Sequence, residues 1–452
     1  MSILSKNSYL KTKYRAFKEK NKNSYLRVKW RTFREAKKAL KLRLKILYIR
    51  KKIESKVQVI SQKSIIKVAF LQMYIAECQN FSLFEKFLKD NRFEPYFIVN
   101  PDIARSEENF ITQYKKTYEE LANKYSGGGA ERVLNGYDFA SKTFIDYTQE
   151  FDLMTTANPY DEMAHQFFKI AYWTQKCIPI FYISYFYLGR CLVSIDNLKL
   201  ETSNYIWKFF AENEEVIKLA QKYQIIKGAN LVLSGYPKMD SLAHHLKQAQ
   251  EPAPTKKLRI IIAPHHSIYE AQSAVGSFLK YYEILYRLMA KNTNIDFIFR
   301  PHPLLFAQLA KEDFWGEAKT QSYFDKICAL NNVTYSTQGD YMEVFANSDA
   351  LIHDCGSFMA EWLYTHKPCA FLYRDNLNTQ VCWTEFGRKC VNAHYAIHNA
   401  QDLDNFIESL CKEQDSLKEQ RMAFAQNEVM INYPNATQKI YEHLVQSLRS
   451  AK

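Results

Sequence analysis

The chain has 452 residues and a formal net charge of +13. This length is too great for one ordinary hydrophobic core, so we expect two domains of roughly 190 residues each. The nine cysteines are scattered singly, and because none falls in a Cys-x-x-Cys pair the sequence supports neither a zinc site nor a redox dithiol. We expect no metal and no cofactor. The odd cysteine count without a signal peptide indicates the cytoplasm, and no apolar run is long enough to span a bilayer.

The basic residues gather at the N-terminus. Residues 1–56 hold 20 Lys and Arg against 3 acidic residues, so the rest of the chain carries −4 of the total of +13. A pattern in this arm, Asn7–Glu19, returns 16 residues later as Asn23–Glu35. Because that spacing is not a whole number of helical turns, we expect two short helices with a break near residues 21–24, and a third helix from about Arg34 to Lys52.

Aromatic and leucine side chains interleave with the cations of this arm, which is typical of a helix that lies in a membrane interface. Each cation near an anionic surface contributes about 1 kcal/mol, so a dozen would hold a peripheral protein firmly. We therefore interpret residues 1–60 as a basic helical arm, whose residues 1–56 bind an anionic membrane surface. Nucleic acid would attract the same charge, and an arm that serves packing or oligomerisation is the structural alternative.

Residues 61–250 predict a first α/β domain. Its expected elements are the strands Ile65–Leu71, Pro95–Val99, Phe151–Thr155 and Ile178–Tyr187, and a helix over Leu83–Leu88. The glycine-rich run Ser126–Gly129 follows a helical stretch rather than a strand, which is the wrong context for a phosphate loop, so we expect a flexible connection there. The proline-containing stretch over residues 248–254 predicts a linker to the next domain.

Residues 255–400 predict a second domain, in which three buried strands end in polar residues. Leu258–Pro264 leads to His265 and His266, Ile295–Phe299 leads to Arg300 and His302, and Ala350–Ile352 leads to His353 and Asp354. Prolines on both sides of His302 stop its strand and hold the imidazole on a stiff loop. Carboxyl ends of parallel strands form the edge where open α/β folds bind ligands, so we expect one shared site there.

The last of these strands passes through a tight turn into a helical pattern. If Ser357 caps that helix, Glu361 lies one turn further on the same face, so both side chains can meet one ligand. Backbone N–H groups at such a turn suit phosphate, and the carboxylate suits a ribose hydroxyl. Arg300 suits bidentate phosphate binding, and His302 can donate to an oxyanion or move a proton. A capped core helix is the alternative.

The motif Arg-Pro-His-Pro at residues 300–303, followed by Asp354-Cys-Gly-Ser357 and Glu361, resembles the CDP-glycerol glycerophosphotransferase family. Ser234–Asp240 is similar to the same family's interdomain region. The resemblance covers roughly residues 65–445. It implies a GT-B-like α/β fold, with two Rossmann-like domains facing a cleft and with residues 401–452 forming helices that brace the two domains.

The resemblance also implies an activity: transfer of glycerol phosphate, or a related polyol phosphate, from a CDP-activated donor to a hydroxyl of a capsule or teichoic-acid-like glycan, with release of CMP. The implied partners are the CDP-polyol and a lipid-linked glycan acceptor rather than nucleic acid. The implied location is the cytoplasm, peripheral on the inner face of the cell membrane. Two alternatives stay open: a GT-B glycosyltransferase that uses a nucleotide sugar, and a membrane assembly factor that has lost catalysis.

The strand ends and the resemblance together give the roles that we expect of individual residues. Those expected to bind the donor are Arg300, His266, His353, Asp354, Gly356, Ser357 and Glu361, and those expected in catalysis are His302, His265 and His165. Gly356 stands where the family usually has a serine, and a backbone N–H could replace the missing hydroxyl.

The Trp-His-Gly-Thr segment that carries an acceptor-side base in the teichoic-acid members is absent from this chain. We take His165 as its replacement, because Asp161 lies four residues earlier and on a helix could orient the imidazole. A surface histidine at an ordinary helix start is the alternative.

Overall fold

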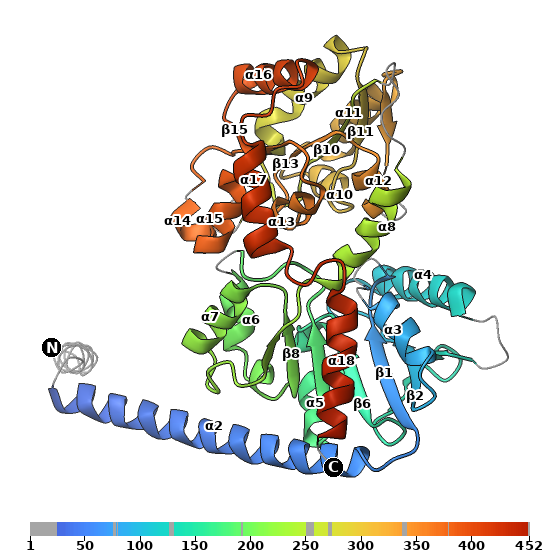
Figure 1. Cartoon of the computed structure of the whole chain (residues 1–452), viewed down its shortest axis with the longest axis vertical. Helices are drawn as coiled ribbons and strands as arrows, with labels where there is room; N and C mark the ends of the chain where they lie inside the picture. Colours follow the sequence, from blue (N-terminus) through green and yellow to red (C-terminus); the bar gives the residue numbers. More distant parts are fainter. Residues whose placement is uncertain are drawn as a thin grey trace, which may run out of the picture. The chain divides into compact units, whose positions relative to one another are not determined.

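The computed structural model describes residues 25–75, 78, 80–125, 131–190, 193–249, 257–269, 274–336, 341–377 and 379–450. The chain divides into two compact units, Met1–Lys52 and Ile53–Lys452. The second unit holds two parallel β-sheets, each with its own helices (Figure 1). We call the sheet between residues 66 and 233, with its helices, the first lobe, and the sheet between residues 259 and 397, with its helices, the second lobe. The first copy of the repeat, the predicted helix break at residues 21–24 and the run Ser126–Gly129 lie outside the described residues.

Helix α2 (Tyr25–Ile60) passes without a break through the described part of the second copy of the repeat, from Tyr25 to Glu35. The predicted start of a separate helix near Arg34 is therefore wrong. The physical reason is that this stretch contains neither glycine nor proline, and its Leu, Lys, Arg and Ala residues all favour a helix. At the end of the helix Ile53, Val57 and Ile60 are buried at helical spacing.

The first sheet has seven parallel strands in the order β3-β2-β1-β6-β7-β8-β9. The strands are β1 Ile66–Gln72, β2 Phe93–Val99, β3 Val133–Asn135, β6 Leu153–Thr156, β7 Ile180–Ile183, β8 Lys208–Ala211 and β9 Leu231–Leu233. The helices of this lobe are α3 Phe81–Leu88, α4 Glu107–Tyr125, α5 Ile170–Gln175, α6 Val193–Lys199 and α7 Glu214–Tyr223, and a small hairpin is formed by β4 Tyr137–Asp138 and β5 Thr143–Phe144. The strands are added in one direction from β1 to β3 and in the opposite direction from β6 to β9, which makes this a doubly wound, Rossmann-type sheet.

The second sheet repeats that arrangement with six parallel strands in the order β12-β11-β10-β13-β14-β15. The strands are β10 Arg259–Ala263, β11 Asp296–Phe299, β12 Val333–Tyr335, β13 Ala350–His353, β14 Cys369–Leu372 and β15 Tyr395–Ile397. Its helices are α9 Phe278–Lys291, α10 Leu305–Leu309, α11 Gly316–Cys328, α12 Tyr341–Ala346, α13 Phe358–Glu361, α14 Thr379–Cys382 and α15 Glu385–Asn392, and α8 Asp240–Gln248 precedes the sheet in the chain. Alternate residues of β10 enter two different cores, Ile260 and Ile262 on one face and Ile261 on the other, so both faces of the sheet are covered.

Three further helices, α16 Ala400–Cys411, α17 Lys418–Phe424 and α18 Ala436–Arg449, end the chain. Helix α18 returns to the first lobe and lies beside α3 (Figure 1). Gln438 of α18 accepts a hydrogen bond from Lys86 at 2.6 Å, and the Tyr441 hydroxyl donates to Asp90 at 2.6 Å. The last helix therefore ties the end of the chain to the start of the first lobe.

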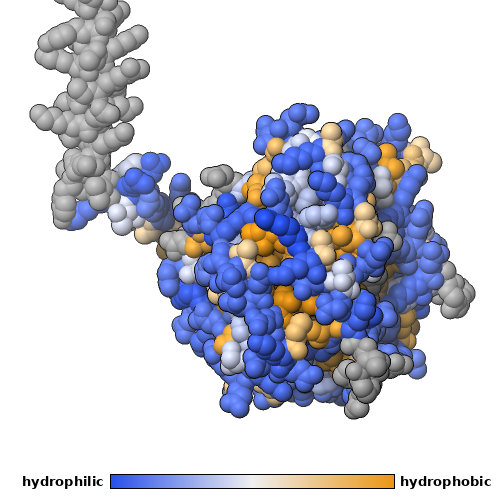
Figure 2. Space-filling model, turned by 90° about the horizontal axis from the view of Figure 1, so that it is seen from above, coloured by the Kyte–Doolittle hydropathy of each residue, from blue (hydrophilic) through white to orange (hydrophobic). Residues whose placement is uncertain are grey.

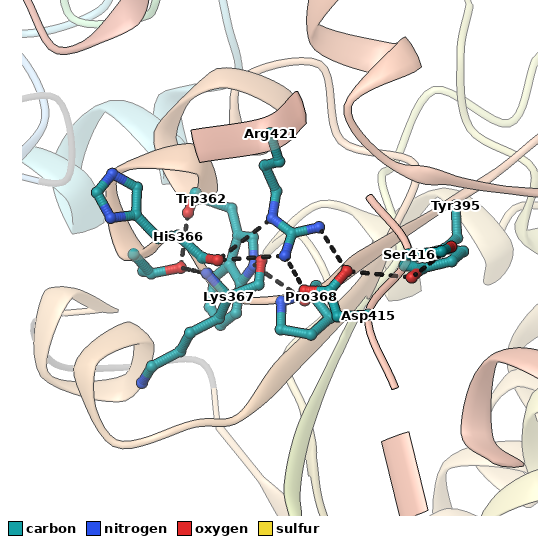
Figure 3. Close-up of polar contacts among 9 residues, drawn as sticks. Trp362, His366, Lys367, Pro368, Tyr395, Asp415, Ser416 and Arg421 are labelled. Atoms are coloured by element: carbon teal, nitrogen blue, oxygen red, sulfur yellow. Dashed lines mark hydrogen bonds and ion pairs between the residues drawn. The ribbon is translucent and has the colours of Figure 1, made fainter. Parts of the chain in front are cut away.

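Helix α17 is anchored to the second lobe by the buried side chain of Arg421. Its guanidinium pairs with the Asp415 carboxylate and donates to the carbonyl oxygen of His366 (Figure 3). The Trp362 indole N–H donates to the carbonyls of Lys367 and Pro368 just beyond α13. These bonds hold residues 362–368, the segment that follows α13, in place.

No helix in the described part of the chain is long and apolar enough to cross a bilayer. Seen from above, the surface is mostly hydrophilic, and apolar side chains gather in limited areas between the hydrophilic ones (Figure 2). Limited apolar areas of this kind are ordinary on a protein surface.

Candidate active site

The carboxyl ends of β10, β11 and β13 lie next to one another, as the sequence predicts. In register, Ala263 pairs with His353 and Ile262 with Phe299, so the three strands end at the same level. The pairing continues into the loop after β11, where the His302 N–H donates to the Pro264 carbonyl at 2.9 Å. Because the order of the strands reverses between β10 and β13, this edge is the switch point at which doubly wound sheets bind ligands.

His265, His266 and His302 form a cluster at this edge. Their ring centroids are 4.3 Å apart for His265 and His266, 5.0 Å for His265 and His302, and 4.0 Å for His266 and His302. Burial lowers the pKa of all three, and that of His302 falls to about 3. The charges of the neighbouring imidazoles lower the pKa of His265 and His302 further. All three rings are therefore neutral at physiological pH.

The bonding of two of these rings fixes where each neutral imidazole keeps its proton. His302 Nδ1 accepts the Leu304 N–H at 3.1 Å. The Ser267 hydroxyl accepts the N–H groups of Val275 and Gly276, so its own hydrogen points to His265 Nδ1, 2.8 Å away. With Nδ1 acting as an acceptor, the proton of each ring sits on Nε2. His265 and His302 thus present N–H donors.

The ligand atoms of the three histidines lie within 4.8 Å of one another, close enough for one metal ion. A histidine that binds a metal usually donates its second ring N–H to an acceptor and offers a lone pair to the ion. His265 and His302 have the opposite arrangement, because each accepts at Nδ1 and holds a proton at Nε2. This donor set fits an oxyanion better than a cation.

Asp354 links the loops that carry the cluster, and its expected donor-binding role stays a prediction. It is fully buried, and its carboxylate accepts the N–H of His265 at 2.6 Å and both the N–H and the hydroxyl of Ser277. Burial raises its pKa to about 6, although these hydrogen bonds favour the charged form. The carboxylate therefore joins the end of β13 to the loop that carries His265.

The helix predicted after Ser357 is much shorter than its apolar pattern suggests. Helix α13 has four residues and continues as a 3₁₀ turn over Trp362–Thr365. Ser357 occupies the N-cap position, but its side chain makes no capping hydrogen bond, so the predicted cap is wrong. Its backbone is already helical, which turns the side chain away from the N–H groups it would otherwise cap.

The side chains of Glu361 and His353 are buried. Glu361 is 1% exposed, and its carboxylate accepts the Tyr341 hydroxyl at 2.7 Å. His353 is 0% exposed and packs against the rings of Phe371 and His394. The ribose contact expected of Glu361 and the donor contact expected of His353 stay predictions.

Arg300, which follows β11, donates to the Ser336 hydroxyl at 2.6 Å, and its donor-binding role also stays a prediction.

His165 does not share a helix with Asp161, so the predicted orientation of its ring by that carboxylate is wrong. A 3₁₀ turn ends at Met163, and His165 is extended. Asp161 instead accepts the N–H groups of Ile170 and Ala171 at the start of α5. The His165 ring stacks on Phe144 at 3.8 Å. Its role as a base stays a prediction without the predicted orienting partner.

The sequence analysis missed Arg190 as a residue of this site. A Cβ atom placed on Gly356 would lie 2.4 Å from Arg190 Nη1, so this arginine of the first lobe reaches the turn after β13. Gly356 and Arg190 are far apart in the chain, and no local pattern links them. The one available signal was the position of Arg190 shortly after the apolar run at residues 178–187, although the strand formed there, β7, ends at Ile183.

The family model described as CDP-Glycerol:Poly(glycerophosphate) glycerophosphotransferase matches residues 188–446, more than half of the chain. The chain belongs to this family. The resemblance predicted from the Arg-Pro-His-Pro and Asp-Cys-Gly-Ser motifs is thereby confirmed, and the protein is an enzyme of the glycerophosphotransferase class. None of the curated proteins compared with the chain matches it.

Solved structures similar to this glycerophosphotransferase share its fold. The wall teichoic acid polymerase TagF is 12% identical, with 91% of this chain and 97% of that chain covered and a TM-score of 0.55. UDP-GlcNAc 2-epimerase from Neisseria meningitidis, bound to UDP-GlcNAc, is 16% identical, with 84% and 99% covered and a TM-score of 0.55. The Methanocaldococcus jannaschii epimerase in complex with UDP-GlcNAc and UDP is 14% identical, with 84% and 100% covered and a TM-score of 0.52. The predicted GT-B-like α/β fold is confirmed.

Proposed function

We propose that this glycerophosphotransferase takes glycerol phosphate, or a close polyol phosphate, from a CDP-activated donor and transfers it to a hydroxyl of a capsule or teichoic-acid-like glycan. The observation that carries the proposal is the cluster of neutral imidazoles at the switch point of the second sheet, with two Nε2–H donors held in place by Ser267 and Leu304. We infer that these donors bind the diphosphate of the donor substrate, at the sheet edge where such folds hold ligands.

In the reaction we propose, the acceptor hydroxyl attacks the phosphorus atom that bears the glycerol. The bond from this phosphorus to the bridging oxygen breaks, and CMP leaves with the electron pair. The N–H groups of His265 and His302 donate to phosphate oxygens as charge shifts onto them. The backbone of Gly356 and Ser357, together with Arg300 and His266, completes the donor-binding set. The acceptor's proton passes to a base of the first lobe, for which His165 is the candidate.

The proposed reaction needs no covalent intermediate with the protein. Phosphoryl transfer depends mainly on holding the reactants in line and neutralising charge. Asp354 serves this demand indirectly, because it holds the backbone of His265 and Ser277 in the arrangement that presents the imidazole. We therefore treat Asp354 as a positioning residue.

We also propose that the basic arm holds the enzyme on the anionic inner face of the cell membrane, where a lipid-linked glycan acceptor is found. Between residues 30 and 48 of α2, six large apolar side chains are exposed: Trp30, Phe33, Leu40, Leu44, Leu47 and Tyr48. At 100° per residue they fall within an arc of about 100° on one side of the helix. An apolar stripe flanked by Lys and Arg suits an interface of acyl chains and anionic headgroups.

A donor panel tests the activity. The purified enzyme is incubated with CDP-glycerol, with UDP-GlcNAc and with a CMP-sugar, and the released nucleotide is identified by chromatography. CMP from CDP-glycerol is the expected product. Release of UDP from UDP-GlcNAc, with CDP-glycerol untouched, would favour the nucleotide-sugar glycosyltransferase. No turnover of any donor in the presence of membranes would favour an assembly factor.

Vesicle flotation tests the arm. Wild type should float with vesicles that contain anionic phosphatidylglycerol and not with neutral ones, and a variant lacking residues 1–56 should stay in solution. A second variant with Trp30, Phe33, Leu40 and Leu44 replaced by serine keeps every charge and separates the apolar contribution from the electrostatic one. Undiminished flotation without residues 1–56 would defeat this part of the proposal.

A further inference from the structure

Arg190 extends its guanidinium to the turn that follows β13. A Cβ atom on Gly356 would lie 2.4 Å from Arg190 Nη1 and 2.9 Å from its Cζ, distances at which the atoms overlap. Glycine at position 356 is therefore what leaves room for the guanidinium. Burial raises the pKa of the adjacent Cys355 thiol, and the charge of Arg190 acts in the opposite direction, as expected for a cation beside this turn.

The second lobe holds the backbone of Arg190 firmly. The Thr384 N–H donates to the Arg190 carbonyl at 3.1 Å, and the Thr384 hydroxyl donates to the carbonyl of Gly189. A Cβ atom on Gly387 would fall 1.8 Å from the Arg190 carbonyl oxygen, so the start of α15 packs directly on this backbone. The backbone of Arg190 is consequently held in place before any ligand arrives, which reduces the entropy lost on binding.

Glu212, a buried carboxyl group that feels the charge of Arg190, does not neutralise the guanidinium. Arg190 Nε is buried and has no hydrogen-bond partner among the described residues, and Glu212 Oε1 also has none. Burial raises the pKa of Glu212 to about 8, so this carboxyl is mostly protonated at neutral pH. A buried donor on a cation without an acceptor is costly, and an anionic ligand would remove that cost.

The site needs positive charge that its histidines do not supply. A diphosphate carries at least two negative charges, whereas His265, His266 and His302 are neutral. Arg190 lies close enough to His265 that its charge, after burial and the two neighbouring imidazoles, contributes to lowering the pKa of that ring. A planar guanidinium also matches the oxygens of a phosphate with two parallel hydrogen bonds.

We propose that Arg190 is a diphosphate-binding residue, contributed by the first lobe to the donor site of the second lobe, in space that Gly356 leaves open. The identity of the nucleotide in this inference rests on the proposed function. The binding of a diphosphate anion by Arg190 does not depend on it. Arg190 gives the first lobe a direct part in holding the donor, in addition to the acceptor-side base proposed for that lobe.

Calorimetric titration of Arg190→Met with CDP-glycerol and with inorganic pyrophosphate tests the inference. Loss of a charge-assisted contact should raise both dissociation constants about 10- to 100-fold. The matched control is Arg92→Met, which removes an arginine that is paired with Asp90 beside α18, and it should bind both ligands like wild type. Wild-type affinity of Arg190→Met for pyrophosphate would overturn the inference.

The two ligands separate the two proposals. If wild type binds pyrophosphate but not CDP-glycerol, and Arg190→Met loses pyrophosphate, the proposed donor is wrong and Arg190 remains an anion-binding residue. If CDP-glycerol is turned over normally by Arg190→Met, the activity stands and the inference fails. If Arg190→Met does not fold, Arg190→Lys decides, because it keeps the charge but not the planar fork: a clear loss of pyrophosphate affinity supports the inference, and wild-type affinity overturns it.

A variant of Gly356 provides a test that leaves Arg190 in the chain. Gly356→Ala places a Cβ atom where the guanidinium now lies, so it should weaken pyrophosphate binding about as much as Arg190→Met. The double variant should be no weaker than either single one, because both remove the same contact. Additive losses would mean that Gly356 and Arg190 act separately, contrary to the inference.

Discussion

Replacing Asp354 with alanine should break the link between β13 and the loop that carries His265. The carboxylate is fully buried and accepts from the backbone N–H groups of His265 and Ser277 and from the Ser277 hydroxyl. Each buried donor left without an acceptor costs about 1–3 kcal/mol. The hydroxyl can rotate to another partner, so the two backbone groups dominate, and we expect a loss of about 2–6 kcal/mol in the free energy of unfolding. That is a large part of the total stability of a typical protein.

The assay is urea denaturation followed by circular dichroism, alongside steady-state kinetics. Ser277→Ala is the matched control, because it removes one of the three hydrogen bonds and should cost about 1 kcal/mol. At temperatures where Asp354→Ala is still folded, its kcat should fall because His265 is no longer held in place. A denaturation midpoint and a kcat for Asp354→Ala that both equal those of wild type would refute this account of the carboxylate.

The pH dependence gives a second check on Asp354. Its folded-state pKa of about 6 lies above the ordinary value of 3.8, so the fold favours the protonated form. Its stabilising contribution is complete below about pH 4 and is lost as pH rises through about 6. A shift of about two units corresponds to roughly 3 kcal/mol. In Asp354→Asn this component is absent, so the variant should compare with wild type more favourably at pH 7 than at pH 4.

Three other changes have definite expected outcomes. Because the pKa of Glu212 is raised to about 8, wild type should lose up to roughly 5 kcal/mol of its free energy of unfolding as pH rises from about 4.5 through 8. In Glu212→Gln this loss should be absent. A pH profile of unfolding equal to that of wild type would contradict the buried, protonated carboxyl. Arg421→Ala removes a fully buried guanidinium from Asp415 and should cost about 3–5 kcal/mol in urea denaturation, so a loss below 1 kcal/mol would contradict the anchoring role of this ion pair. His302→Ala should lower kcat about 10²- to 10³-fold with little change in melting temperature, and normal turnover would remove the imidazole from the mechanism.

The sequence predicted the second sheet and its site well, because the signals were local. Short apolar runs that end at prolines or polar residues marked β10, β11 and β13, and parallel strands of one doubly wound sheet must present their carboxyl ends together. The proximity of His265, His266 and His302 followed from that rule. The family motifs lie on the same loops, so pattern and geometry agree.

The errors have separate physical causes. The run after Ser357 has helical spacing, but the helix gives way to a 3₁₀ turn after four residues, and spacing alone does not distinguish these. Asp161 caps α5 instead of facing His165, because a short polar side chain can serve nearby backbone groups better than a helix interior. Arg190 was missed because only the packing of two lobes brings it to Gly356.

We propose that the cytidine diphosphate of a polyol donor binds at the edge formed by β10, β11 and β13. The most direct measurement is calorimetric titration of wild type and of His302→Ala with CDP-glycerol, next to UDP-glycerol as the base-exchanged counterpart. The account predicts heat from wild type with CDP-glycerol, much weaker binding by His302→Ala, and weaker binding of the uridine compound. Avid binding of UDP-glycerol with none of CDP-glycerol, or equal binding by His302→Ala, would contradict it.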